Sequence, residues 1–317
     1  MVKLTPNATA FIFPGQGSQS VGMGKELAEA YPVARRTFEQ ADELLGIPLT
    51  RLAWEGPENE LNDTVNTQPA LLTHSTAVLR VIGQLQPGLR PAFVAGHSMG
   101  ELSALAAAMA LPFEAALRLA RRRGELMKKA GEVSPGGMAA VLGSDLATIE
   151  RLCAEASTPD EIVQVANDNC PGQYVISGAK AALERLIQLA PQAGVRKIRA
   201  LAVSIAAHSP LMAHAQADFN QAVEEAPVLD PAIALIGNVS ALPLTTAGEI
   251  RADLRLQLSS RVRWSESILE MSRRGVTTFL ELGSGSVLTG LLKRIDEQLI
   301  GKALGTAADF EKLLAEL

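Results

Sequence analysis

A serine flanked by glycines two residues to either side is the first feature of this chain that could do chemistry. The segment GHSMG, residues 96–100, follows a short apolar run and precedes a stretch rich in Ala and Leu. In such a strand-to-helix turn the glycines let strand and helix approach closely, so that the serine hydroxyl projects above the sheet. We therefore predict that Ser98 is a nucleophile; the alternative is a serine that only caps the helix.

A nucleophilic serine needs a general base near neutral pH, and the chain contains four histidines. His208 ends a predicted strand and precedes Pro210, which suits the first turn of a helix; the carboxyl end of a strand is a usual place for chemistry in an α/β fold. His97 should point away from the neighbouring hydroxyl, and His74 and His214 lie in helical patterns. We predict His208 as the base, the alternative being a helix-start residue bonded to backbone.

The order of these residues separates the chain from an ordinary α/β-hydrolase. In that fold an acid follows the nucleophile and the histidine comes near the C-terminus. Here no histidine follows His214, so the base comes from the middle of the chain. A simple esterase is therefore disfavoured.

The elements that must position these residues alternate between strands and helices. Apolar runs predict strands at 10–13 and 92–95, and helical patterns cover residues 25–45, 68–85, 112–130 and the stretch from 101 onward. This alternation favours an α/β fold with a mainly parallel sheet. Residues 131–137, rich in Gly, Ser and Pro, are typical of a linker.

The pattern changes after this linker. Strands are predicted at 138–142, 162–167, 173–177 and 196–203, and helices at 146–156 and 179–189. The order β-α-β-β-α-β is typical of a small ferredoxin-like unit. We therefore expect an α/β-hydrolase-like core, residues 1–132 and 204–317, with an inserted ferredoxin-like subdomain, residues 133–203.

Composition excludes several other classes of protein. The chain has 317 residues, of which 47% are apolar and 20% charged, and a net charge of -5 that argues against general nucleic-acid binding. No apolar run reaches the roughly 18 residues that a membrane span needs, and no signal peptide is evident. Cys153 and Cys170 fit packing residues of a reduced cytoplasm. No His/Cys ligand cluster or phosphate-binding loop occurs, so we expect neither metal nor cofactor.

Several segments in order resemble the malonyl-CoA:acyl carrier protein transacylases, the acyltransferases of fatty-acid and polyketide synthesis. They are FIFPGQGSQSVGMG, GHSMGELSAL, RRRGELM, AAHSPLM, QLSSRVRWSESI and ELGSGSVLTGLLKRI, and the resemblance covers nearly the whole chain. It implies a ping-pong transfer of malonyl from coenzyme A to the phosphopantetheine thiol of an acyl carrier protein. Ser98 would carry the malonyl ester and His208 would be the base.

The same resemblance implies roles for other residues. The backbone carbonyl of Gln257 would orient the base in place of the aspartate of a triad, and the backbone amides of Gln16 and Met99 would form the oxyanion hole. Arg123 would bind the malonyl carboxylate through two parallel hydrogen bonds, and Gln68 would contact the acyl group.

Simpler interpretations remain open for these residues. Gln16 is also compatible with a turn, Gln257 with a polar helix end, and Arg123 with one of three consecutive surface arginines, as its neighbours Arg121 and Arg122 are expected to be. Asn167 is a weaker candidate for acyl contact and more typical of a turn.

The sequence also departs from the family pattern. Arg261 stands where many relatives have proline, and Ala207 stands before the histidine where some relatives have a larger side chain. The small Ala207 leaves room beside the acyl group, so a second donor such as methylmalonyl stays possible.

Basic side chains could meet an acidic carrier protein or the coenzyme A phosphates. They are Arg196, Lys197, Arg199, Arg261 and Arg263; a solvated charged surface is the alternative. Other functions also stay open: an acyltransferase serving a polyketide synthase or a malonate decarboxylase, a hydrolase that edits carrier proteins, and a non-enzymatic docking scaffold. Arg123 favours a dicarboxylic acyl group over editing, and the presence of Ser98 and His208 disfavours the scaffold.

Overall fold

The computed structural model describes residues 4–201, 203 and 205–316. Its larger sheet has six strands in the order β10-β9-β1-β2-β7-β8. They are β1 (Thr9–Phe13), β2 (Phe93–Gly96), β7 (Leu235–Ile236), β8 (Pro243–Leu244), β9 (Thr278–Leu282) and β10 (Ile300–Leu304). All neighbours are parallel except β7 and β8, which are antiparallel. The predicted α/β fold is confirmed.

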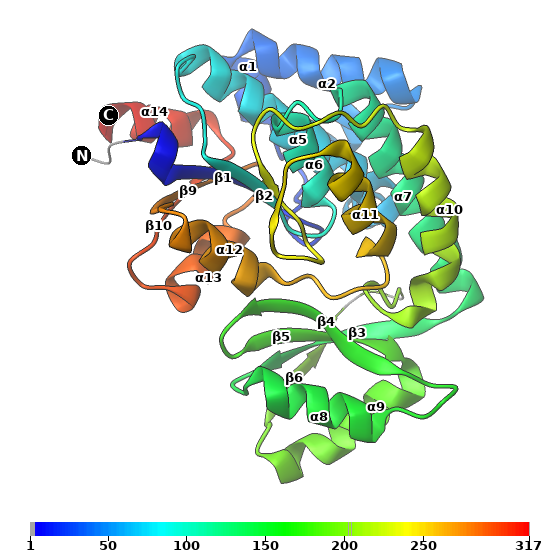
Figure 1. The fold of residues 1–317 in the computed structure, drawn as a ribbon. Coiled ribbons are helices and arrows are strands. Elements are labelled where there is room, and N and C mark those ends of the chain that lie inside the picture. Colours follow the sequence, from blue (N-terminus) through cyan, green and yellow to red (C-terminus); the bar gives the residue numbers. More distant parts are fainter. Residues whose placement is uncertain (1–3, 202, 204, 317) are drawn as a thin grey trace.

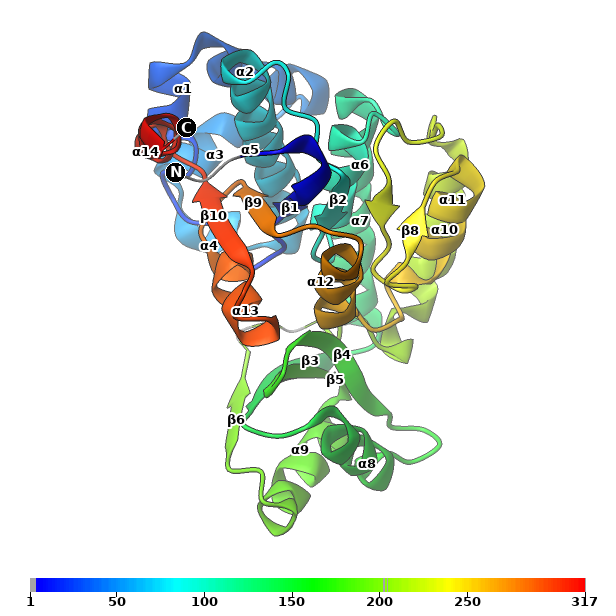
Figure 2. The same ribbon diagram turned by 60° about the vertical axis from the view of Figure 1, so that its left-hand side comes forward.

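Helices bury both faces of this sheet, as Figures 1 and 2 show. On one side lie α1 (Lys25–Ala30), α2 (Pro32–Leu45), α5 (Thr64–Leu85), α6 (Gly100–Ala107), α7 (Phe113–Val133), α10 (Ala213–Glu225) and α11 (Ala247–Gln257). On the other lie α12 (Trp264–Arg273) and α13 (Val287–Ile295). In β1, Phe11 and Phe13 pack into the first core, whereas Ala10 and Ile12 pack into the second. Burial on both faces explains why this strand is apolar throughout.

Shorter helices complete the chain. They are α3 (Leu49–Glu55), α4 (Glu58–Leu61), α14 (Ala307–Glu316) and the 3-10 turns η1 (Pro6–Ala8), η2 (Ala190–Ala193) and η3 (Pro210–Met212). Helix α14 packs against α1, beside the edge strand β10. Among the helices of the described residues, none is both long enough and apolar enough to cross a membrane.

The second sheet is antiparallel and has four strands in the order β4-β5-β3-β6. They are β3 (Gly136–Leu142), β4 (Val163–Cys170), β5 (Gln173–Ala179) and β6 (Lys197–Ala200), joined by α8 (Leu146–Ala156) and α9 (Lys180–Leu189). These two helices pack on one face of the sheet over a core of their own, which includes Ile149, Ile176 and Leu186. The green part of Figures 1 and 2 is this layer, with its helices turned away from the larger sheet.

Several predicted element bounds differ from the structure. Residues 25–45 form two helices rather than one, because the chain is extended at Tyr31 before Pro32, and a residue before proline avoids helical backbone. Helix α5 starts at Thr64 rather than residue 68, because Asp63 caps it by accepting a hydrogen bond from Val65 N–H. The strand predicted at 196–203 is only β6, Lys197–Ala200; residues 202 and 204, at the expected subdomain boundary, lie outside the described residues.

The linker predicted at 131–137 is almost absent. Helix α7 reaches Val133 and strand β3 begins at Gly136, which leaves only residues 134 and 135 between them. A Cβ on Gly136 would come within 2.6 Å of both the Ala206 Cβ and the Gly178 carbonyl oxygen. The glycine therefore marks a close approach of backbones rather than a flexible connection.

Candidate active site

Ser98 lies at the sharp turn between β2 and α6, with a φ of 53°. A Cβ on Gly96 would lie 1.9 Å from the Gly100 carbonyl carbon, and one on Gly100 would lie 2.3 Å from the Phe13 carbonyl oxygen. Both positions therefore require glycine. Asn238, in the turn that follows β7, braces this segment: its Oδ1 accepts from Ser98 N–H at 2.7 Å, and its Nδ2 donates to the Gly96 carbonyl at 2.7 Å.

The His208 ring lies directly against this hydroxyl. Its Nε2 is 2.7 Å from Ser98 Oγ, and its Nδ1 is 2.9 Å from the Gln257 carbonyl oxygen and 3.1 Å from that of Ser260. Carbonyl oxygens only accept hydrogen bonds, so Nδ1 carries the proton and Nε2 presents a lone pair. The arrangement can take the proton of Ser98.

The protonation state of His208 agrees with this tautomer. The side chain is 3% exposed, and burial, together with the positive charge of Arg123, lowers its pKa from 6.5 to about 3. The imidazole is therefore neutral near pH 7. A neutral ring is the form that can accept a proton.

Arg123, on α7, is buried beside the same hydroxyl. It is 1% exposed, so it is not a surface arginine, whereas Arg122 is exposed and Arg121 pairs with Glu125. Its Nη2 donates to Ser98 Oγ at 3.1 Å, and its Nε donates to Gln257 Oε1 at 3.2 Å. Burial lowers its pKa to about 10, which leaves it charged at neutral pH.

No carboxylate of the described residues forms an ion pair with Arg123. Its remaining partner is Gln68 Oε1, which accepts from Nη1 at 2.8 Å. The carboxyl of Glu101 acts on the guanidinium only through space, and a buried charge without a carboxylate in contact is costly. The site can therefore accept an anion next to the nucleophile.

Gln68 is placed differently from the predicted substrate contact. It lies on α5, is completely buried, and its Nε2 donates to Thr64 Oγ1 at 2.9 Å while its Oε1 faces Arg123. It is not among the residues that line the cavity. Its observed contact is with the arginine, and contact with an acyl group stays a prediction.

A buried polar network connects the nucleophile turn to Arg123. Gln257 Nε2 donates to the Ser98 carbonyl oxygen at 3.1 Å and also to the carboxylate of Glu101 on α6. Glu101 also accepts from Asn238 N–H at 3.3 Å. Burial, followed by the charge of Asp253, raises the pKa of Glu101 well above its usual value. Through its amide, Gln257 thus contacts the serine turn, the glutamate and the arginine.

The predicted oxyanion donors lie where the cavity meets Ser98. Gln16 follows β1, and its Oε1 accepts from Thr64 Oγ1 at 2.8 Å. Within the part of the chain that the structure describes, the backbone N–H groups of Gln16 and Met99 form no hydrogen bond. Both residues line the cavity, so these two donors are free to meet a ligand oxygen.

The cavity itself lies between the two sheets. Ser98, His208 and Arg123 line its floor together with apolar residues from both layers: Met127, Met138, Val175, Leu201, Val203, Ile205, Leu288 and Leu291. The four-stranded sheet adds Asn167 and Asn169. The described residues contain no group of three His, Cys, Asp or Glu side chains that could hold a metal ion.

His97 turns away from the nucleophile, as predicted, and bonds to the other sheet. Its Nε2 lies 2.8 Å from Asn169 Oδ1, and Asn167 Nδ2 is 3.4 Å from the same nitrogen. Asn167 lies in β4, as the strand predicted at 162–167 implies, at a point where the register with β5 shifts; its side chain bonds to His97 rather than to a turn. An irregular strand lets neighbouring side chains reach the same region.

Sequence reasoning missed three polar residues at the site, namely Glu101, Gln164 and Asn238. Glu101 had a usable signal, because it is an acidic residue in an otherwise apolar helix next to the glycine turn. Asn238 and Gln164 had none, since they come from a loop and a strand that meet the site only in three dimensions.

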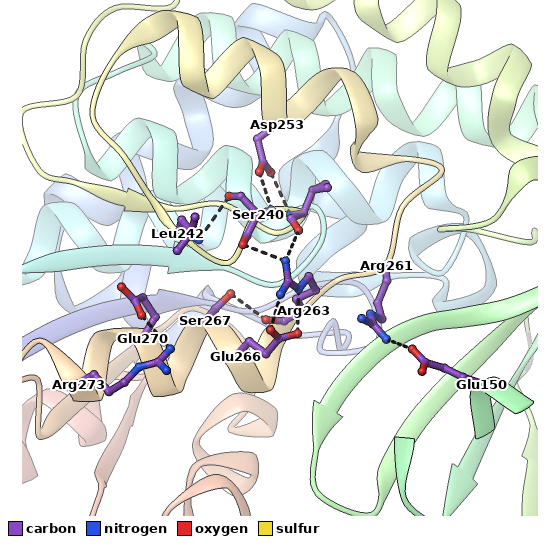
Figure 3. Close-up of polar contacts among 11 residues, drawn as sticks. Glu150, Ser240, Leu242, Asp253, Arg261, Arg263, Glu266, Ser267, Glu270 and Arg273 are labelled. Carbon is purple, nitrogen blue, oxygen red and sulfur yellow. Dashed lines mark hydrogen bonds and ion pairs between the residues drawn. The ribbon is translucent and has the colours of Figure 1, made fainter. Parts of the chain in front are cut away.

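Two of the basic residues predicted to meet a partner form ion pairs with other residues of this chain. Arg261 pairs with Glu150 of α8 at 2.7 Å, and Arg263 bonds to Glu266 at 2.8 Å and to the Ser240 carbonyl at 3.1 Å, as Figure 3 shows. Arg196, Lys197 and Arg199, at strand β6, are exposed. They remain the candidates for a charged partner.

Comparison with known proteins gives one consistent result. Residues 10–307 match the family described as acyl transferase domain. The chain is 44% identical over 290 residues to the malonyl CoA-acyl carrier protein transacylase of Bacillus subtilis, covering 92% of this chain and 91% of that protein. It is 44% identical over 297 residues to the protein of that name from Escherichia coli K12, covering 93% and 95%.

Solved structures agree with the sequence relatives. A crystal structure of malonyl-CoA:acyl carrier protein transacylase from Xanthomonas oryzae superposes with a TM-score of 0.94 at 42% identity, covering 98% of each chain. A complex of a type II PKS acyl-carrier protein with its malonyl-transacylase gives a TM-score of 0.93 at 40% identity, covering 98% of this chain and 99% of that one.

Proposed function

This chain belongs to the acyl transferase family, and on that basis we propose that it transfers a malonyl group from coenzyme A to the phosphopantetheine thiol of an acyl carrier protein. The relatives named as malonyl CoA-acyl carrier protein transacylases cover nearly all of its length. Its activity is therefore that of an S-malonyltransferase. Malonyl-CoA and an acyl carrier protein are its partners, as a carrier protein is for the related transacylase solved in complex.

One observation carries the mechanism that we propose. Ser98 Oγ lies 2.7 Å from a neutral imidazole nitrogen and 3.1 Å from a buried guanidinium nitrogen. The first contact can remove the serine proton, and the second places a cation where the free carboxylate of a malonyl group would end. The hydroxyl oxygen of the nucleophile therefore contacts both the base and the cation that would bind the malonyl carboxylate.

The first half of the cycle forms an ester. His208 Nε2 takes the proton of Ser98 as Oγ attacks the thioester carbonyl, and the amides of Gln16 and Met99 stabilise the oxyanion. Collapse of the intermediate breaks the C–S bond, and the imidazolium gives its proton to the coenzyme A thiolate. The products are malonyl-Ser98 and free coenzyme A.

The second half reverses these steps with a different thiol. The phosphopantetheine thiol of the carrier protein gives its proton to His208 and attacks the ester, and Ser98 leaves with the proton returned to it. In both halves of the cycle, the carbonyls of Gln257 and Ser260 accept the hydrogen bond from Nδ1–H, which orients the ring and stabilises the imidazolium.

Arg123 selects the acyl group in this proposal. A malonyl carboxylate would supply the counter-charge that the described residues do not provide, through bonds to the guanidinium. An acetyl group would leave the guanidinium buried and unpaired. Gln68 and Gln257, which accept from Nη1 and Nε, would fix the plane of the guanidinium for this contact.

We extend the proposal to the architecture. The mainly parallel six-stranded sheet with its glycine-flanked serine turn supports an α/β-hydrolase-like core, residues 1–132 and 204–317. The order β4-β5-β3-β6 with two helices on one face supports a ferredoxin-like subdomain, residues 133–203.

The test is mass spectrometry of the intact protein after mixing with malonyl-CoA. The wild type should gain one malonyl group, located on Ser98 by peptide mapping, and lose it on addition of a carrier protein that bears phosphopantetheine. Ser98→Ala should gain none. A folded wild type that gains no malonyl group, or gains it on another residue, would contradict the proposal.

A further inference from the structure

The backbone of His208 adopts an uncommon conformation. Its φ is 58°, in the left-handed region that residues other than glycine rarely occupy. Such strain persists only where surrounding contacts fix it. The side chain can reach Ser98 only from the backbone direction that these contacts set.

The last residue of α11, Gln257, and the three residues after it present four consecutive carbonyls, of which three contact His208. The Leu258 carbonyl accepts from His208 N–H at 2.9 Å, and those of Gln257 and Ser260 accept from its Nδ1–H. The fourth carbonyl, that of Ser259, points elsewhere and accepts from Gln164 Nε2 at 3.0 Å.

Gln164 closes this arrangement from the other sheet. It lies on β4, and its Nε2 also donates to the His208 carbonyl oxygen at 2.7 Å. One amide group thus uses both of its hydrogens, one on the base and one on the loop that holds the base. Among the described residues, Gln164 forms no side-chain hydrogen bond with Ser98 or Arg123, so it reaches the site only through His208 and the loop that holds it.

The position of Gln164 is itself fixed by pairing with that loop. Asp168 N–H donates to the Val262 carbonyl at 2.9 Å, and Val262 N–H donates to the Ala166 carbonyl at 2.8 Å. These two bonds form an isolated parallel bridge between Asn167 of β4 and Val262, three residues beyond each end of the Gln164–Ser259 contact. In Figure 3 this loop passes between α11 and the green sheet, with Arg261 reaching to Glu150.

We infer that Gln164 is a positioning residue for His208: it holds the left-handed backbone of the base so that Nε2 faces Ser98. The inference rests on the proposed function, since it assigns Gln164 to the acylation step of that reaction. The four-stranded sheet, which supplies no reacting atom, thereby sets the geometry of the base.

The first test is the rate of Ser98 malonylation in Gln164→Ala. We expect kcat to fall about 10- to 100-fold, the range for a base displaced from its position, while KM for malonyl-CoA changes less than twofold because the arginine site is intact. The matched control is Glu150→Gln, which removes an ion pair between the same two regions without touching His208 and should keep the wild-type kcat.

The second test separates positioning from general destabilisation and needs no alanine variant. In Gln164→Glu the carboxylate cannot donate to either carbonyl at neutral pH, whereas its protonated form can donate to one. Its kcat relative to wild type at the same pH should rise as pH falls from 8 to 5. A merely structural role would leave this ratio constant or lower it.

The outcomes are distinguishable. Absence of malonyl-Ser98 in the wild type defeats the proposed function. If the wild type is malonylated, the inference is overturned by a wild-type kcat in Gln164→Ala, by an equal loss in Glu150→Gln, or by a Gln164→Glu ratio that does not rise at low pH. Should Gln164→Ala not fold, the Gln164→Glu ratio decides alone.

Discussion

The six-stranded sheet and the four-stranded sheet meet at one cavity but contribute different groups to it. Ser98, His208, Arg123 and the carbonyl of Gln257 all come from segments around the larger sheet. The smaller sheet contributes apolar wall residues and the amides of Asn167 and Asn169, while Gln164 bonds to His208 outside the cavity lining. We expect chemistry to be concentrated in the first region, and shape and positioning in the second.

The difference has a physical origin. Parallel strands end at the same edge of a sheet, and Ser98, after β2, and Gln16, after β1, lie at that edge. His208 reaches the same place from the chain that returns from the smaller sheet. The antiparallel strands of the smaller sheet run alongside that edge and present side chains from its middle. They can brace and enclose the site from their own core, which shares no residue with the cores of the larger sheet.

The division of roles between the two sheets would fail most clearly if the enzyme did not need His208. We predict that His208→Ala lowers kcat for malonyl transfer by at least about 10⁴-fold, as loss of a catalytic base typically does. The matched control is His214→Ala, an exposed histidine of α10 that should keep full activity. Stopped-flow measurement of coenzyme A release gives both rates; a loss below tenfold in His208→Ala would remove it from the chemistry.

A substitution at Arg123 should change which acyl group the enzyme prefers more than it changes the rate with an uncharged acyl group. In Arg123→Ala we expect kcat/KM for malonyl-CoA to fall about 150- to 5,000-fold, since breaking a buried ion pair costs roughly 3–5 kcal/mol. The value for acetyl-CoA should change far less, so that the preference shifts toward acetyl. Competition between the two donors measures this ratio, with the exposed Arg122→Ala as control; an unchanged preference would mean that another group binds the carboxylate.

A matched pair of asparagines tests the two regions directly. Asn238→Ala, on the larger-sheet side, leaves Ser98 N–H and the Gly96 carbonyl unpaired and should lower the acylation rate about 10- to 100-fold, for roughly 1–3 kcal/mol of unsatisfied groups. Asn169→Ala, on β4, removes one neutral hydrogen bond to His97 and should cost about fivefold or less. An equal or reversed order in single-turnover assays would contradict the division between the regions.

The smallest expected effect is a shift along the pH axis. We propose His208 as a neutral base, and its pKa is lowered to about 3, so wild-type acylation should stay level from pH 8 to 5 and be lost as pH falls toward that pKa. Removing the Arg123 charge favours the imidazolium and raises the pKa, so the acid limb of Arg123→Ala should move to higher pH. Acetyl-CoA as donor avoids titration of the malonyl carboxyl; a wild-type limb near pH 6.5 would contradict the assignment.

Sequence reasoning was most successful where chemistry is local. The turn around Ser98 follows from two glycines whose Cβ positions are blocked by backbone, and α8 was predicted with its observed bounds, Leu146–Ala156. Periodicity and glycine spacing act within a few residues, so the α/β fold and the nucleophile turn could be predicted.

Residues that depend on long-range packing could not be predicted from pattern alone. Gln164 and Asn238 contact His208 and Ser98 across many intervening residues, and no local rule distinguishes them from other polar residues. The same holds for residues 131–137, where glycine signalled a linker but serves a close backbone approach. Gln68 was predicted to contact the acyl group; packing places it against Arg123 and outside the cavity lining, and acyl contact stays a prediction.

The partners of His208 Nδ1 have a consequence for the direction of the reaction. Two peptide oxygens, instead of an aspartate, face the ring. In the proposed mechanism, therefore, no anion at Nδ1 stabilises the imidazolium, and this protonated form is short-lived. Transfer of an acyl group between two thioesters is close to isoenergetic. In the proposed mechanism, strong stabilisation of the imidazolium would therefore not help an enzyme that catalyses the transfer in both directions. A site built on neutral acceptors suits a reversible exchanger, whose net flow is decided by the supply of donor and carrier.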